Sequence, residues 1–112
     1  MKNNLSNILL ISDIDGTLID KDFKIPKRNI QAIERFKKAG GNTVVDATMP
    51  GIGREPLMLK KISEESGLNV IMGTGYYVTS THPEAMKAMT VEEIADEMVK
   101  EITVGVDGVR LA

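Results

Sequence analysis

Short apolar runs alternate along the chain with segments of helical periodicity. The apolar runs cover residues 8–12 (ILLIS), 42–48 (NTVVDAT) and 68–75 (LNVIMGTG). Each run is too short for a typical helix and is bounded by polar residues or glycine. The pattern therefore predicts three buried parallel strands.

Three other segments carry apolar residues at helical spacing. Residues 26–41 and 56–67 each open with a proline and close with glycine, as helices often do. The third segment, residues 90–105, is the clearest because Thr90 and Glu93 form a capping box at its start. Its apolar face is made by Val91, Ile94, Ala95, Met98, Val99 and Ile102.

The order β-α-β-α-β-α predicts an α/β fold: a small parallel sheet of three strands with right-handed βα crossovers. We expect the strand order 1-2-3, with the first two helices on one face. The sequence does not decide whether residues 108–112 (GVRLA) form a fourth strand. It also leaves two arrangements possible, a Rossmann-like sheet and a partial barrel. The long segment 76–89 is expected to contain a short helix at residues 83–89 (PEAMKAM).

The bulk composition indicates one ordinary globular domain over residues 1–112. Apolar residues make up 42% and charged residues 27%, and the net charge of −2 gives no reason to expect nucleic acid or a membrane surface. The absence of cysteine excludes disulfides and thiolate metal sites. The apolar run ILLI is too short to span a bilayer, and residues 1–7 (MKNNLSN) do not form a signal peptide. We expect a soluble, cytoplasmic protein.

The opposite face of the predicted sheet would be bare, which soluble monomers rarely tolerate. One solution is that segment 76–89 carries the last helix across to that face. The other is a homodimer, which we favour because the edge of the third strand also needs a partner.

Carboxylates gather where the first two strands end. Asp13 and Asp15 lie in "DIDGTL" and point to the same side of an extended backbone, and Asp46 and Thr48 end the second strand. The carboxyl ends of parallel strands are where α/β sheets bind ligands. Three carboxylates there favour a weak, open Mg²⁺ site.

The motif "DIDGTL" and the following "IPKRNIQAIERFKKAGG" resemble the haloacid dehalogenase superfamily of Mg²⁺-dependent phosphatases, closest to its Cof-type branch. This resemblance implies that Asp13 attacks phosphorus, Asp15 is the acid/base and both hold Mg²⁺. Thr48 stands where that family has a serine or threonine. The family's later lysine and acidic pair have no counterpart, so the resemblance implies an incomplete site.

From about residue 44 the chain resembles another family, the phosphotriesterase-like amidohydrolases, through "GIGR", "SEESGLNVIMGTGYY" and "EEIADEMVKEI". This resemblance implies barrel strands two and three of a TIM barrel with a two-metal hydrolytic site. The family's metal ligands lie on other strands. His82 is interpreted as a solvated or capping residue, and Tyr76 and Tyr77 as covering the core edge.

Two families joined inside one strand indicate an engineered or recombinant chimera. Residues 1–43 would form a phosphatase-like half and residues 44–112 a barrel-like half. We therefore expect no evolved catalytic activity and no required cofactor. Two alternatives stay open: residual Mg²⁺ or phosphate binding with weak phosphohydrolase activity at Asp13 and Asp15, and a natural truncated phosphatase acting as a binding module.

Overall fold

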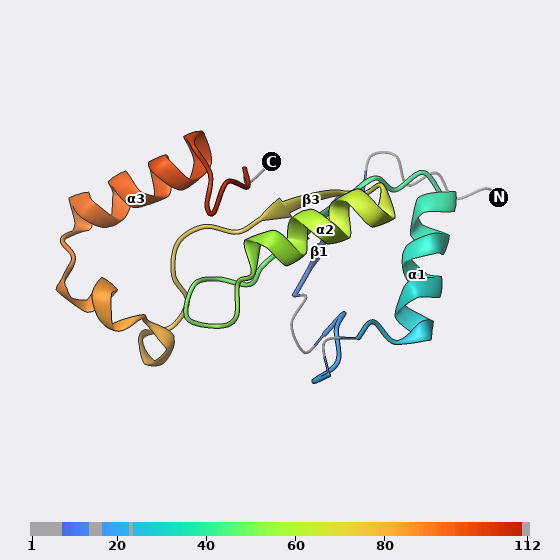
Figure 1. Ribbon diagram of the computed structural model, residues 1–112, viewed down its shortest axis with the longest axis horizontal. Coiled ribbons are helices and arrows are strands. Elements are labelled where there is room, and N and C mark those ends of the chain that lie inside the picture. Colours follow the sequence, from blue (N-terminus) through green and yellow to red (C-terminus); the bar gives the residue numbers. More distant parts are fainter. Residues whose placement is uncertain (1–7, 14–16, 23, 111–112) are drawn as a thin grey trace.

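The computed structural model describes residues 8–13, 17–22 and 24–110. Within them, β1 (Leu10–Ser12), β2 (Thr43–Asp46) and β3 (Asn69–Met72) form one parallel sheet in the order β1-β2-β3 (Figure 1). The helices α1 (Lys27–Lys38), α2 (Pro56–Ser66) and α3 (Val91–Thr103) alternate with and follow the strands. The predicted α/β fold and strand order are confirmed.

Local sequence signals account for the ends of α2 and α3. Pro56 occupies the first turn of α2, and Gly67 ends that helix in the left-handed conformation with φ of 66°. The capping box of α3 is present: Thr90 N–H donates to Glu93 Oε2 over 2.7 Å, and Glu93 N–H donates to Thr90 Oγ1 over 3.2 Å.

Helix α2 covers one face of the sheet and carries the core. Ile19, Leu59 and Met72 form the buried cluster, and Ile62 and Val70 pack against it. Successive side chains along a strand point to opposite faces of the sheet. The row formed by Ile11, Val45 and Ile71, which are in register, therefore lies on the face away from α2.

The prediction that the first strand is buried is wrong. Leu10 and Ile11 are 37% and 64% exposed. The strand lies at an edge of the sheet, and α2 packs against the other edge strand, β3. An apolar run predicts a strand but does not tell which part of the sheet a helix will cover.

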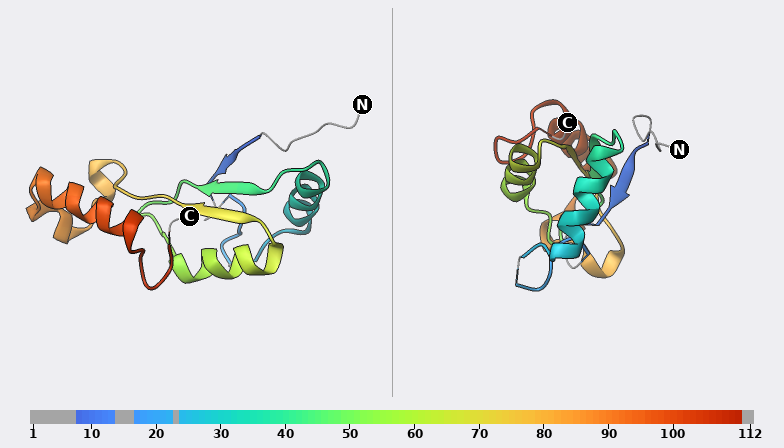
Figure 2. Two further views of the ribbon diagram at one scale, coloured as in Figure 1. Left: turned by 90° about the horizontal axis from the view of Figure 1, so that it is seen from above. Right: turned by 90° about the vertical axis from the view of Figure 1, so that its right-hand side faces the viewer.

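The other two helices lie beyond the sheet instead of on its face (Figures 1 and 2). Helix α1 runs crosswise near the amino ends of β2 and β3 and has no buried residue, contrary to the expected pairing of the first two helices on one face. Helix α3 projects past the carboxyl ends of the strands, so it does not cover the bare face. The molecule is therefore long, 52 × 29 × 24 Å.

The segment between β3 and α3 contains two short 3₁₀ helices, Thr79–Thr81 and Glu84–Ala88. The second lies where a short helix was expected. After α3, Val106 and Val109 pair with each other in an antiparallel bridge across a turn at Asp107 and Gly108. The described residues therefore add no fourth strand to the sheet, and residues 111 and 112 of the expected strand lie outside them. No helix in the described ranges is both long and apolar enough to cross a membrane.

Candidate functional site

The carboxyl ends of the three parallel strands meet at one edge of the sheet. The β2–α2 loop, residues 47–55, and the β3–α3 segment, residues 73–90, both leave from this edge. In α/β folds this is the edge where ligands bind. Two clusters of polar side chains lie there.

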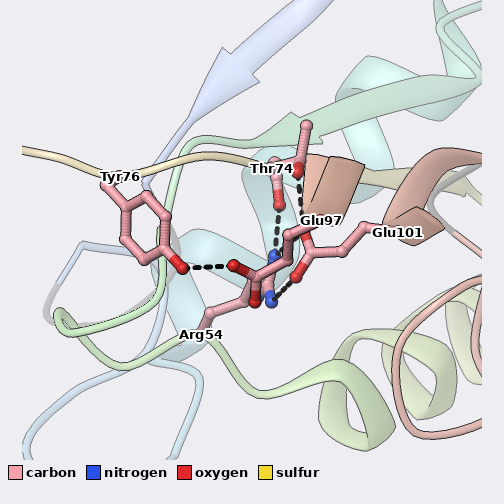
Figure 3. Close-up of polar contacts among 6 residues, drawn as sticks. Arg54, Thr74, Tyr76, Glu97 and Glu101 are labelled. Atoms are coloured by element: carbon pink, nitrogen blue, oxygen red, sulfur yellow. Dashed lines mark hydrogen bonds and ion pairs between the residues drawn. The ribbon is translucent and has the colours of Figure 1, made fainter. Parts of the chain in front are cut away.

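The first cluster centres on an ion pair between the β2–α2 loop and α3 (Figure 3). Arg54 Nη2 lies 2.6 Å from Glu101 Oε1, and Arg54 Nη1 lies 2.8 Å from Glu101 Oε2, a bidentate geometry. The side chains are only 7% and 12% exposed. The hydrogen bonds from Arg54 hold the pKa of Glu101 below its ordinary value against the opposing effect of burial, and the same contact raises the pKa of Arg54.

Residues after the end of β3 make further hydrogen bonds with both members of this ion pair. Thr74 Oγ1 donates to Glu101 Oε2 over 2.6 Å, and Arg54 Nη1 donates to the Gly73 carbonyl oxygen over 3.0 Å. Glu101 therefore accepts hydrogen bonds from two separate loops. The β2–α2 loop, the end of β3 and helix α3 are joined at this one carboxylate.

A second carboxylate of α3 binds a tyrosine one helical turn earlier. The Tyr76 hydroxyl donates to Glu97 Oε2 over 2.7 Å (Figure 3). This hydrogen bond, burial and the negative charge of Glu97 raise the pKa of Tyr76 to about 12. Tyr76 is therefore a protonated donor throughout the neutral range.

The β3–α3 segment also makes contacts within itself. The ring of His82 lies edge-on to that of Tyr76, with centroids 6.0 Å apart, and His82 Nε2 is 2.9 Å from the Tyr77 carbonyl oxygen. His82 thus contacts its own loop. Tyr76 reaches α3, whereas the Tyr77 side chain is 60% exposed.

The second cluster contains three of the residues predicted at the strand ends. Thr48 Oγ1 lies 2.7 Å from Asp13 Oδ1 and 2.7 Å from Asp46 Oδ1, and Thr48 N–H donates to Asp46 Oδ1 over 3.1 Å. Asp46 and Thr48 are 1% and 2% exposed, and Asp13 is exposed. Asp15 lies outside the described residues. The catalytic and metal-binding roles expected for Asp13, Asp15 and Thr48 stay predictions.

The Arg54–Glu101 and Tyr76–Glu97 contacts were not predicted from the sequence. Glu97 and Glu101 are four residues apart and so lie on one face of a helix, which was a usable signal. Their partners were not predictable, because Arg54 is 47 residues from Glu101 in the chain.

The described parts of the chain contain no group of three or more histidine, cysteine, aspartate or glutamate side chains that could hold a metal ion. The resemblance to the amidohydrolases places the ligands of that family's two-metal site on other strands, outside these residues. The polar clusters hold loops and helices together.

Comparison with known proteins gives a match to the phosphotriesterase family over residues 15–112. The chain is 38% identical to an N-acetyltaurine hydrolase of Xenopus tropicalis over 109 residues, 97% of this chain and 28% of the relative. It is 47% identical to an N-acetyltaurine hydrolase of Danio rerio over 94 residues, 84% of this chain and 26% of the relative. The chain thus spans about a quarter of the length of these curated relatives.

Two solved structures share this architecture. A phosphotriesterase homology protein from Escherichia coli, described as complexed with phosphate in its active site, has a TM-score of 0.72 and 26% identity over 92% of this chain and 38% of its own. A resiniferatoxin-binding protein from Rhodobacter sphaeroides has a TM-score of 0.67 and 41% identity over 74% of this chain and 24% of its own.

These matches overturn the predicted chimera. The family match crosses the expected junction between residues 43 and 44, and the Xenopus relative aligns with nearly the whole chain. The predicted engineered or recombinant chimera with a haloacid dehalogenase half is therefore wrong. The residual phosphohydrolase activity predicted from that half is wrong as well. The physical reason is that a strand ending in Asp-Gly before a helix is a local pattern open to many parallel α/β folds.

Proposed function

Because the chain belongs to the phosphotriesterase family, we propose that it forms one wall of the substrate pocket in a hydrolase acting on N-acetyltaurine or a similar N-acylated amine. The observation that carries this proposal is the relation to the N-acetyltaurine hydrolase of Xenopus tropicalis over 97% of this chain. The aligned region includes the loops at the carboxyl ends of β2 and β3. Barrel enzymes build their active sites from such loops.

The geometry supports a role in shaping the pocket. The loops at the strand ends are held by hydrogen-bonded side chains, and no buried side-chain nitrogen or oxygen in the described ranges lacks a partner. A wall with few alternative conformations loses little entropy when it binds a substrate. No hydrolytic step is assigned to these residues, since the described ranges hold no group of three or more histidine, cysteine, aspartate or glutamate side chains that could bind a metal.

A segment exchange tests the proposal. The matched segment of the Xenopus tropicalis N-acetyltaurine hydrolase is replaced by residues 15–112 of this chain, and hydrolysis of N-acetyltaurine is measured from the release of acetate. We expect kcat/KM within about tenfold of the parent enzyme. The control exchange uses the corresponding segment of the Escherichia coli homology protein, which is 26% identical to this chain. We expect the control to lose more activity.

Two outcomes would overturn the proposal. One is a folded exchange protein, with the circular dichroism and oligomeric state of the parent, that does not hydrolyse N-acetyltaurine. The other is an exchange protein that hydrolyses a different amide or a phosphate ester better than N-acetyltaurine.

The 112-residue chain alone should show no turnover of N-acetyltaurine. Its described residues offer no metal cluster, and catalytic groups that act as a unit lose most of their effect when some are missing. The measurement is acetate release with and without added Zn²⁺ or Mg²⁺. Turnover that persists through repurification would contradict this prediction.

A further inference from the structure

Helix α3 has little apolar contact with the rest of the molecule. It projects beyond the carboxyl ends of the strands (Figures 1 and 2). Val91, Val99 and Ile102 on its apolar face are 77%, 58% and 53% exposed. Among its residues only Glu101 is buried, and Glu101 is the partner of Arg54. Ile94 and Met98 are only partly buried, so the buried contact of α3 is the polar one at Glu101.

Three side chains outside the helix make these polar contacts: Arg54 and Thr74 bind Glu101, and Tyr76 binds Glu97. Arg54 binds both carboxylate oxygens of Glu101 and also the Gly73 carbonyl oxygen. The Arg54 guanidinium, which belongs to the β2–α2 loop, thus connects α3 with the end of β3. One turn earlier along the same helix, Glu97 accepts the hydrogen bond of Tyr76.

We infer that Arg54 is a positioning residue that fixes α3, and through α3 the Tyr76 side chain and the β3–α3 segment, at the carboxyl edge of the sheet. The effect on a substrate rests on the proposed function, in which this segment lines the pocket. The effect on α3 itself is independent of any activity.

The chemistry of this contact requires arginine. A guanidinium presents two parallel N–H groups to a carboxylate and keeps a further N–H for the Gly73 carbonyl, whereas a lysine ammonium is a point donor on a flexible stem. Loss of either charge would leave the other in a nearly dry position without compensation. Arg54→Lys keeps the positive charge and removes the two parallel hydrogen bonds to Glu101. It therefore separates the effect of positioning from the effect of losing a charge.

The first test is hydrogen exchange of the full 112-residue chain, followed by mass spectrometry. In Arg54→Lys and Glu101→Gln we expect exchange in α3 and in residues 73–89 to rise by about tenfold or more, with α2 and β2 unchanged. The charge-swapped double variant Arg54→Glu/Glu101→Arg should recover part of the protection. The matched control is Lys61→Ala, which removes an exposed ion pair with Glu65 and should change nothing.

The results separate a positioning role from a general structural one. Increased exchange confined to α3 and residues 73–89 supports the inference. An equal rise throughout the chain would mean that Arg54 stabilises the whole fold, and no rise would mean that α3 is held by other contacts. Either of these results overturns the inference.

The second test uses the exchange protein described above. Arg54→Lys should raise KM for N-acetyltaurine about tenfold and change kcat by less than about threefold, because a displaced pocket wall weakens binding more than the chemical step. The charge-swapped double variant should lower KM again. An unchanged KM together with increased exchange in α3 would overturn the effect on substrate. An exchange protein without any activity would overturn the proposed function and leave the first test as it stands.

Discussion

Thr48 is a buried polar residue just after the end of β2. It is 2% exposed, and its hydroxyl lies 2.7 Å from a carboxylate oxygen of Asp13 and 2.7 Å from one of Asp46. A hydroxyl has a single proton, so it donates to one of these carboxylates at a time. Its backbone N–H also donates to Asp46, which shapes the exit from β2.

Thr48→Val should lower the free energy of unfolding by about 1–3 kcal/mol. The substitution preserves shape and removes the hydroxyl that two carboxylates approach, one of them buried. The matched variant Asp13→Ala acts on the exposed side of the same cluster and should stay within about 0.5 kcal/mol of the unmodified chain. Urea unfolding followed by circular dichroism measures both. Equal losses in the two variants would contradict this account.

Tyr76 should titrate late in an ultraviolet absorbance titration. Its folded-state pKa is raised from 10.0 to about 12 by the hydrogen bond to Glu97. A raised pKa means that the stability contributed by the neutral phenol is complete below pH 10 and is lost as the pH rises through about 12. Tyr76→Phe should remove the late step, and Glu97→Gln should move it back toward 10.0. A late step that survives Glu97→Gln would assign the shift to another cause.

The ends of the elements were predictable from sequence, whereas their placement was not. Residues 56–67 and 90–105 were expected to be helical, and α2 and α3 occupy residues 56–66 and 91–103. Caps and helix-breaking residues act over one turn, so they are visible in the sequence. The location of α3 depends on contacts between distant residues, such as that of Arg54 with Glu101, and no local pattern specifies those.

The attachment of α3 should weaken in acid. The pKa of Glu101 is lowered from 4.5 in the folded state, first by its hydrogen bonds from Arg54. A lowered pKa means that the ion pair contributes its full stability above pH 4.5 and loses it as the pH falls through the folded-state value. Thermal unfolding of the unmodified chain and of Glu101→Gln should therefore differ at neutral pH and converge in acid.

Glu65→Gln is the control for this acid effect. Glu65 forms an exposed pair with Lys61 at 3.8 Å, and the two side chains are 66% and 70% exposed, so little stability depends on it. We expect its melting curve to follow that of the unmodified chain at every pH. A gap between the unmodified chain and Glu101→Gln that stays constant down to acid pH would contradict the assignment to this ion pair.

At the scale of the whole molecule, the parallel sheet was predicted correctly from the sequence, whereas the predicted family of the first part of the chain was wrong. Asp13, Asp46 and Thr48 do meet at the ends of neighbouring strands, because the carboxyl ends of parallel strands share an edge. The family assignment of residues 1–43 failed because a strand, a turn and a helix in this order are common to many α/β proteins. The continuity of the family match across residues 15–112, together with the alignment to the Xenopus relative over 97% of the chain, shows one family and not two.

Exposed apolar residues in and next to β1 predict self-association of this chain. Ile8, Leu9 and Ile11 near or within β1 are 52%, 53% and 64% exposed, and β1 has an unpaired edge in the sheet formed by the described residues. Exposed apolar side chains beside an open strand edge favour pairing with another strand, and a second copy offers an identical surface. We therefore expect a homodimer that buries β1.

Sedimentation velocity over a range of concentrations tests this dimer. Ile11→Lys should weaken the association at least about tenfold, because a buried ammonium would lose its hydration at the interface. Val91→Lys is the matched control, since Val91 is 77% exposed and lies on α3, away from β1. A monomer at every concentration would contradict the prediction. Equal weakening by the two variants would place the interface on a surface other than β1.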